Sequence, residues 1–150
     1  MATSFPISLL SLTHFSISFS IPGLNETKLG IAAPYWMGEL LASTVGNREA
    51  ELGLGLGKLY TPSEAQAVGL VDEIHPRDEI RPKAEEWAKV WGGIPEIARH
   101  ASKNLTRRAK IDDLLSRRDE DVEWFTSFIL RDDVQKNLTL YLEGLANRKK

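Results

Sequence analysis

The spacing of apolar and polar residues changes once along this chain. Over residues 15–21, Phe and Ile alternate strictly with Ser, and Pro22-Gly23 ends the alternation. A period of two is typical of a half-buried β-strand. The sequence therefore predicts a strand over residues 15–21, with a degenerate targeting peptide and an unstructured segment as the alternatives.

After Gly23, apolar residues recur three or four apart, which is the spacing of amphipathic helices. This spacing predicts helices over residues 29–45, 48–56, 95–110 and 134–145, a helix that carries Trp87 and Trp91 and ends at Gly92-Gly93, and a long periodic stretch over residues 111–130. Such a pattern indicates a mostly α-helical chain with one or two short strands.

The middle of the chain contains signals for a short helix and a second strand. Thr61-Pro62-Ser63-Glu64 has the form of a capping box with Pro at the first helical position. The helix that it opens is expected to end at Gly69 and to be followed by a strand over residues 70–74. Pro76 and Pro82 are expected to bracket a linker.

Composition excludes several classes of function. The 150 residues include no Cys, so we expect no disulfide, thiolate metal site or cysteine nucleophile. A net charge of −2 gives no general attraction to nucleic acid or to anionic membranes. The three His residues are scattered, and the sequence predicts no metal site.

Residues 1–25 contain no Asp, Glu, Lys or Arg. This stretch lacks the basic start and continuous apolar core of a secretory signal, and it lacks the Arg residues of a mitochondrial presequence. Its longest apolar run is two residues, so no membrane span is expected. We therefore separate an atypical Ser-rich segment, residues 1–22, from residues 23–150.

Two further motifs could bind phosphate, and for both we favour a structural explanation. The glycines of residues 53–58 fit neither the dinucleotide fingerprint nor the Walker loop, so we predict the close packing of a helix end. His100, Lys103, Arg107 and Lys110 share one helical face. This basic face could meet the phosphates of a nucleotide-like group, although a solvated surface is the more common explanation.

Glu26 is a candidate of another kind. It follows the predicted strand and enters a stretch with apolar Leu24 and Ile31. A carboxylate in such surroundings can act as a general acid and base. From the residues alone, a helix cap or a partner for a helix dipole remains the alternative.

Several blocks of this sequence resemble one enzyme family. The string GLNETKLGI over residues 23–31, followed by Ala33-Pro34-Tyr35-Trp36, resembles the mitochondrial Δ3,Δ2-enoyl-CoA isomerases of the crotonase superfamily. Residues 60–72, YTPSEAQAVGLVD, are similar to the helix-then-strand segment of that superfamily. Further blocks match in order and spacing, namely Arg117-Asp119-Asp121-Val122, Ser127-Phe128-Ile129, Gln135-Lys136 and Tyr141-Leu142-Glu143.

The resemblance implies a fold and a reaction. It implies an incomplete α/β crotonase-type fold, of which residues 23–150 are the helix-rich C-terminal half. Glu26 corresponds to the single catalytic acid/base, which moves a proton from C2 to C4 of a 3-enoyl-CoA and yields 2-trans-enoyl-CoA in fatty-acid β-oxidation. Leu24 and Asn25 are assigned to substrate binding by the same string. No cofactor is implied, because coenzyme A is part of the substrate.

The resemblance also implies limits and partners. In the family, the oxyanion-hole loops and most contacts to coenzyme A belong to the N-terminal half, so we expect a truncated chain with impaired activity. The alternatives are a non-catalytic chain that acts by subunit association, or another crotonase reaction such as hydration of 2-enoyl-CoA. The family implies a homotrimer formed through the C-terminal helices and a location in the mitochondrial matrix, with peroxisome and cytosol as alternatives.

Overall fold

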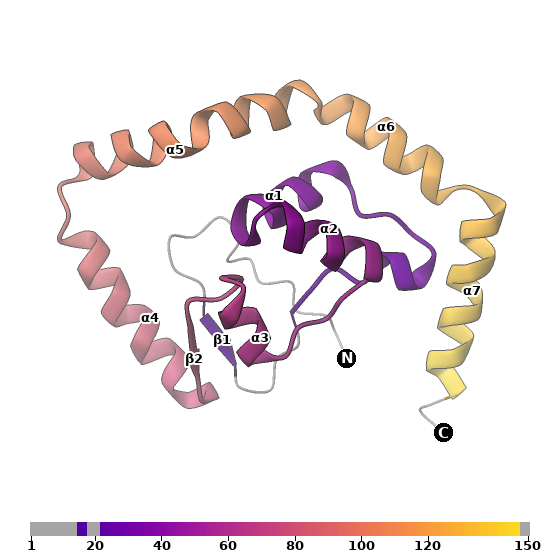
Figure 1. The fold of residues 1–150 in the computed structure, drawn as a ribbon, viewed down its shortest axis with the longest axis horizontal. Coiled ribbons are helices and arrows are strands. Elements are labelled where there is room, and N and C mark those ends of the chain that lie inside the picture. The colour runs from indigo at the N-terminus through magenta and orange to yellow at the C-terminus, as the bar shows by residue number, and fades with distance from the viewer. Residues whose placement is uncertain (1–14, 18–21, 148–150) are drawn as a thin grey trace. The chain divides into compact units, whose positions relative to one another are not determined.

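The computed structural model describes residues 15–17 and 22–147 (Figure 1). Its elements in chain order are β1 (Phe15–Ile17), the 3-10 helix η2 (Glu26–Leu29), α1 (Tyr35–Val45), α2 (Asn47–Leu56), α3 (Pro62–Ala67), β2 (Glu73–His75), α4 (Arg77–Gly92), α5 (Glu96–Ser116), α6 (Arg118–Ile129) and α7 (Asp132–Asn147). The prediction of a mostly helical chain with one or two short strands is confirmed for these residues.

The elements form two compact units. The first unit contains β1, Pro22 and Tyr60–Arg117, and the second contains Gly23–Leu59 and the chain from Arg118 onward. Each unit is thus built from segments that are distant in the sequence. The predicted separation of residues 1–22 from residues 23–150 stays a prediction.

The first unit is organised around a short parallel ladder. β1 pairs with β2 in the register Phe15↔Glu73, Ser16↔Ile74 and Ile17↔His75, and α4 lies beside β1 (Figure 1). The predicted strand is confirmed at Phe15–Ile17, while residues 18–21 lie outside the described residues. Tyr60, which is fully buried, donates its N–H to the Pro22 carbonyl at 2.8 Å.

The capping box at the start of α3 forms as predicted. The Thr61 hydroxyl accepts the Glu64 N–H at 3.3 Å, and the Glu64 carboxylate accepts the Thr61 N–H at 2.8 Å. These reciprocal bonds satisfy two donors that a helix start leaves free. They also fix the chain direction into α3, where Ala65 is fully buried.

The second unit packs α1 against α2 and places η2 against both α2 and α7 (Figure 1). Its buried apolar side chains are few and come from separate segments: Leu24, Leu41, Ala50 and Val134. An antiparallel bridge between Gly23 and Leu59 closes the loop that carries η2, α1 and α2. The core of this unit therefore lies beside the segment that carries Glu26.

The predicted start of the helix over residues 29–45 is wrong, because α1 begins only at Tyr35. Gly30 ends η2 in the left-handed region, with φ of 75°. Pro34 has an extended ψ of 150°, and proline disfavours helical geometry in the residue before it. The chain between these two residues therefore stays outside the helix.

The predicted linker between Pro76 and Pro82 is also wrong. Pro76 caps α4, and Pro82 lies inside that helix. A proline there costs the helix one hydrogen bond. A later turn of α4 is bound to β2, because the Trp87 indole N–H donates to Glu73 at 2.8 Å. This contact with the strand favours the helix despite the proline.

Two other boundaries differ from the sequence prediction. β2 comprises Glu73–His75 and not residues 70–74, because the N–H groups of Leu70 and Val71 turn back to the Ala65 carbonyl. The periodic stretch 111–130 is divided between α5 and α6 at Arg117. Ser116 precedes the break and donates its hydroxyl to the Asp113 carbonyl at 2.8 Å, a bond of the kind that competes with helix continuation.

No helix among residues 15–17 and 22–147 combines the length and apolar character that crossing a bilayer requires.

Candidate active site

The backbone at Glu26 is fixed by a short helical turn and its glycine cap. The Glu26 carbonyl accepts the Ile31 N–H at 3.0 Å, and the neighbouring Thr27 carbonyl accepts the Gly30 N–H at 3.1 Å. Gly30 adopts φ of 75°, a conformation that side chains other than glycine rarely tolerate. This glycine thus explains why Glu26 sits on a tight turn and not on a longer helix.

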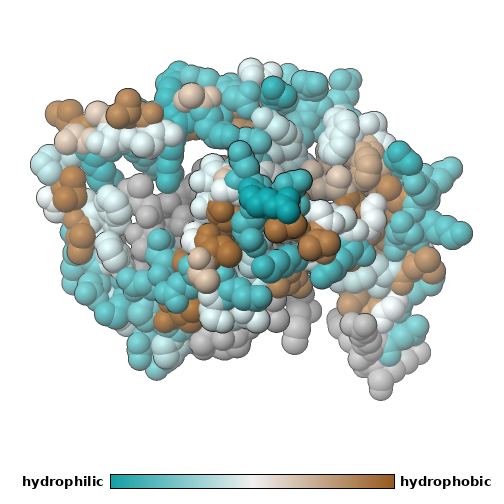
Figure 2. All heavy atoms as spheres, viewed as in Figure 1, coloured by the Kyte–Doolittle hydropathy of each residue, from teal (hydrophilic) through white to brown (hydrophobic). Residues whose placement is uncertain are grey.

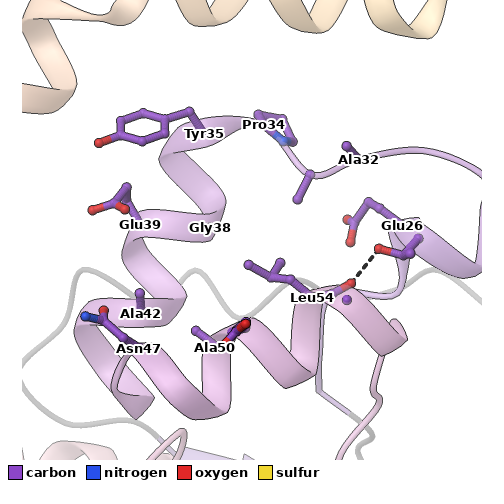
Figure 3. Close-up of a pocket in the computed structure, with 14 residues that line it drawn as sticks. Glu26, Ala32, Pro34, Tyr35, Gly38, Glu39, Ala42, Asn47, Ala50 and Leu54 are labelled. Atoms are coloured by element: carbon purple, nitrogen blue, oxygen red, sulfur yellow. Dashed lines mark hydrogen bonds between the residues drawn. The ribbon is translucent and has the colours of Figure 1, made fainter.

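Two helices of the second unit support this turn. The Thr27 hydroxyl donates to the Leu54 carbonyl of α2 (Figure 3). At the end of α2, Gly57 has φ of 55° and approaches Lys28 so closely that a Cβ atom would lie 2.9 Å from its Cγ. From the other side, a Cβ on Gly30 would lie 2.5 Å from the Asn137 amide nitrogen of α7.

The Glu26 carboxylate lies at a cavity of about 480 Å³. Figure 3 shows the side chain pointing into the space between Ala32, Pro34 and Leu54. Its Oε2 atom is buried and has no hydrogen-bond partner among the described residues. A carboxylate oxygen that is removed from water and unpaired is available to accept a proton from a bound molecule.

The cavity continues from Glu26 along the facing sides of α1 and α2. Its lining residues are Glu26, Thr27, Ala32, Ala33, Pro34, Tyr35, Gly38, Glu39, Ala42, Asn47, Ala50, Glu51, Leu54 and Gly55. Most of them are apolar or small, and the ionisable members are three glutamates and Tyr35. The volume lies within the range of about 300–1,000 Å³ that small-molecule sites occupy.

An acidic residue from α6 anchors the start of α1. The N-cap residue of α1 is Pro34, whose side chain offers no capping hydrogen bond. The Asp121 carboxylate instead accepts the Tyr35 N–H at 2.7 Å. A carboxylate at a helix N-terminus also interacts favourably with the helix dipole. Asp121 therefore holds one wall of the cavity from 86 residues away in the sequence.

The other predicted substrate-binding residues occupy different positions. Leu24 is buried in the core, with 6% of its surface exposed, and Asn25 is the N-cap residue of η2. Neither is among the residues that line the cavity. Their assignment to substrate binding stays a prediction.

The glycine-rich residues 53–58 form the end of a helix, as predicted. Gly53 and Gly55 lie within α2, and Gly57 is its left-handed C-cap. The basic face lies on α5, where the His100 Nε2 atom is 2.9 Å from the Asn104 amide nitrogen. Its binding to phosphate stays a prediction. Among the described residues, no group of three or more His, Asp or Glu side chains is arranged to hold a metal ion.

Sequence reasoning did not single out several residues that shape this site. Glu39 brings a second carboxylate to the cavity, and its spacing from Tyr35 on one helical face was the available signal. Asn137 supports the Glu26 turn from α7, and no local pattern marks it. Asp121 belongs to a block that matches the isomerase family, but its contact with α1 follows only from the fold.

Comparison with known proteins agrees with the isomerase resemblance. The chain is 46% identical over 127 residues to mouse mitochondrial enoyl-CoA delta isomerase 1 and 44% identical over 127 residues to the human enzyme. These matches cover 85% of this chain but 44% and 42% of the relatives, so the chain spans less than half of their length.

Solved structures agree with a crotonase-type fold. The crystal structure of human mitochondrial delta3-delta2-enoyl-CoA isomerase superposes with a TM-score of 0.88 and 40% identity, covering 95% of this chain and 56% of that chain. Carnitinyl-CoA hydratase from Mycobacterium avium gives a TM-score of 0.81 over 91% of this chain and 54% of its own, at 20% identity, and this likeness shows the fold alone.

The family model described as enoyl-CoA hydratase/isomerase matches residues 18–148. This match includes η2, both walls of the cavity and every helix from α1 to α7. The chain belongs to the enoyl-CoA hydratase/isomerase family.

Proposed function

We propose that Glu26 is the acid/base of a Δ3,Δ2-enoyl-CoA isomerase and that the cavity beside it receives the acyl part of a 3-enoyl-CoA. The observation that carries the proposal is the buried, unpaired Oε2 atom at the apolar cavity. The delta isomerases with 44–46% identity support this reaction over others within the family.

The reaction requires one group that first accepts and then returns a proton. Glu26 removes a proton from C2 of the 3-enoyl thioester, and the electron pair of that C–H bond forms a dienolate. The same carboxyl group then delivers the proton to C4, so the double bond moves from C3–C4 to C2–C3. No atom is gained or lost, and no cofactor takes part, because coenzyme A belongs to the substrate.

The negative charge of the dienolate collects on the thioester oxygen, which requires hydrogen-bond donors. Loss of one such donor typically costs about 100- to 1,000-fold in kcat. The family resemblance assigns both donors to the N-terminal half of family members. The isomerase activity of the isolated chain therefore tests whether its own residues supply enough hydrogen-bond donors for the thioester oxygen.

Conversion of a 3-enoyl-CoA to its conjugated isomer tests the proposal, because conjugation raises ultraviolet absorbance. We expect impaired turnover by the purified chain, because the oxyanion donors are assigned to the N-terminal half of family members, and a further loss of about 100- to 10,000-fold in Glu26→Gln, which is the usual contribution of a general acid/base. Glu123→Gln is the matched control, because Glu123 is an exposed residue of α6. Folded protein without turnover contradicts the proposal.

Hydration of 2-enoyl-CoA is the competing reaction in this family, and the same absorbance measurement distinguishes it from isomerisation. A hydratase consumes the conjugated thioester, so absorbance falls when 2-trans-enoyl-CoA is supplied. An isomerase instead raises absorbance when the 3-enoyl thioester is supplied. If absorbance falls with 2-trans-enoyl-CoA but does not rise with the 3-enoyl thioester, and if Glu26→Gln abolishes that fall, the site carries out hydration.

A second candidate function is association with further copies of this chain. Large apolar side chains are exposed on α5, α6 and α7, including Leu105, Leu115 and Leu142 at 87%, 64% and 62%. Apolar surface of this kind is favourably buried between subunits. We propose a homotrimer formed through the C-terminal helices, and this association does not require catalysis.

We further propose the mitochondrial matrix as the location of the protein. The support is that the mouse and human relatives are named mitochondrial enzymes. Fractionation of cells that express the chain with a C-terminal tag tests the proposal. We expect the tag in the matrix fraction, and a peroxisomal or cytosolic tag contradicts it.

A further inference from the structure

The turn that carries Glu26 is short, and burial of its own residues does little to fix it. All four residues of η2 keep part of their surface exposed. A 3-10 turn also has poorer hydrogen-bond geometry than an α-helix, so its position depends on contacts with neighbouring elements. The direction of the Glu26 carboxylate therefore depends on what holds η2.

The Thr27 hydroxyl makes such a contact with α2. It donates to the Leu54 carbonyl, which lies 27 residues away in the sequence (Figure 3). Leu54 belongs to the last turn of α2, where carbonyl groups lack partners within the helix. The same carbonyl accepts the Gly57 N–H at 3.3 Å. Thr27 thus joins η2 to a helix end that its glycine cap already fixes.

Leu54 also belongs to the wall of the cavity. It lines the cavity together with Glu26 and Thr27, and the Glu26 carboxylate points into the space beside it (Figure 3). The hydroxyl bond of Thr27 therefore links the segment that carries the carboxylate to the wall that the carboxylate faces.

We infer that Thr27 is a positioning residue for Glu26, because its hydroxyl holds η2 against the end of α2 with the neighbouring carboxylate directed into the cavity. The inference rests on the proposed function, which makes Glu26 the group that moves the proton. A general base acts only within about 2.6–3.2 Å of the atom that loses the proton. A small displacement of η2 therefore slows proton transfer while the binding cavity stays in place.

Substitution by a residue of the same shape tests the role of the hydroxyl. Thr27→Val removes the donor and keeps the branched side chain, whereas Thr27→Ser keeps the donor. One neutral hydrogen bond corresponds to about three- to tenfold in rate, so we expect Thr27→Val to lower kcat by that factor and to change KM by less than about twofold. Thr27→Ser should restore kcat.

Two further variants make this test specific. Thr44→Val is the matched control, because Thr44 donates its hydroxyl to the Leu40 carbonyl within α1 at 2.8 Å and lies outside the cavity lining. It should leave kcat and KM unchanged. Thr27→Ala serves if Thr27→Val does not fold, because Thr27 is exposed and alanine favours helical backbone. It should lower kcat as the valine variant does.

A nuclear magnetic resonance signal reports the position of the carboxylate without any need for turnover. Glutamate labelled at its carboxyl carbon gives a signal for Glu26, identified as the one that Glu26→Gln removes. This signal should move in Thr27→Val and keep its place in Thr44→Val. It should also stay close to its place in Thr27→Ser, whereas an effect of altering any neighbouring side chain would move it in both Thr27 variants.

The outcomes separate this inference from the proposed reaction. An unchanged kcat and an unmoved Glu26 signal in Thr27→Val overturn the inference, as do equal effects in Thr27→Ser or in Thr44→Val. If turnover depends on Glu26 while Thr27→Val retains it, the proposed function stands and the inference fails. If the signal moves only when the Thr27 hydroxyl is absent and the chain shows no turnover, Thr27 positions the carboxylate and the proposed reaction fails.

Discussion

At the scale of single residues, Glu73 shows how one carboxylate joins two elements. Its Oε2 atom lies 2.6 Å from His75 Nε2 within β2, and its Oε1 atom accepts the Trp87 indole N–H from α4 at 2.8 Å. His75 Nδ1 also lies 3.9 Å from the Glu79 carboxylate. The bond to His75, followed by the bond to Trp87, lowers the pKa of Glu73 below its ordinary value of 4.5.

This lowered pKa predicts a pH dependence of stability. A group whose pKa is lower in the folded state stabilises the fold above its unfolded pKa, and this stability is lost as pH falls through the folded value. Glu73→Gln should therefore lower the free energy of unfolding at neutral pH and weaken its dependence on pH below about 4.5. Urea unfolding followed by circular dichroism at several pH values measures both effects.

Glu86→Gln is the control for this prediction. Glu86 pairs with Lys83 on α4 at 2.9 Å, and both side chains are exposed. Exposed pairs of this kind contribute little to stability, so the control should follow the unchanged chain across the pH range. A steep acid transition retained in Glu73→Gln would show that other carboxylates govern it.

At the scale of elements, the contact between η2 and α7 predicts the effect of a single methyl group. Gly30→Ala forces a side chain into the left-handed region and towards Asn137, where only 2.5 Å is available. Left-handed strain alone costs about 1–2 kcal/mol, so we expect a loss of about 1–3 kcal/mol in the free energy of unfolding. The turn that carries Glu26 should shift with it.

A second substitution separates the two causes. In Gly30→Ala combined with Asn137→Ala, the steric conflict with the amide is removed while the backbone strain remains. Urea unfolding of the single and double variants should therefore show partial recovery. Full recovery would assign the whole effect to α7, and no effect of the single variant would contradict the close approach.

The elements that the sequence predicted well are those decided by local chemistry. The capping box at Thr61, the glycine stop after α4 and the helix end at residues 53–58 all depend on residues within one helical turn. The errors arose where distant contacts outweighed local signals. Pro82 lies within a helix that the Trp87 hydrogen bond links to β2. A contact between distant residues of this kind cannot be predicted from the spacing of apolar and polar residues around Pro82.

The candidate site divides in the same way. Glu26 could be proposed from its surroundings and from the family resemblance. The cavity could not, because it needs the face of α1 against the face of α2, and the pattern does not define how two helices meet. Asp121 reaches α1 across 86 residues, so its role required the fold.

At the scale of the whole molecule, the balance of charge and exposed apolar surface favours self-association. The net charge is −2 for 150 residues, so repulsion between copies is weak. Hydrophobic residues lie among hydrophilic ones on the face seen in Figure 2. On α7, Tyr141, Leu142 and Leu145 are exposed at one side of the helix, beyond the buried Val134 on the same side.

This α7 face offers a test of the proposed homotrimer. We expect sedimentation to give three times the 16.8 kDa chain mass. Leu142→Asp should shift the protein towards monomer, because a carboxylate buried between subunits loses its hydration without a partner. Asn147→Asp adds the same charge to the opposite side of α7 and should leave the trimer intact. The prediction is contradicted if the unchanged chain is a monomer, or if Leu142→Asp does not weaken the trimer. Either result would show that this side of α7 does not form a subunit interface.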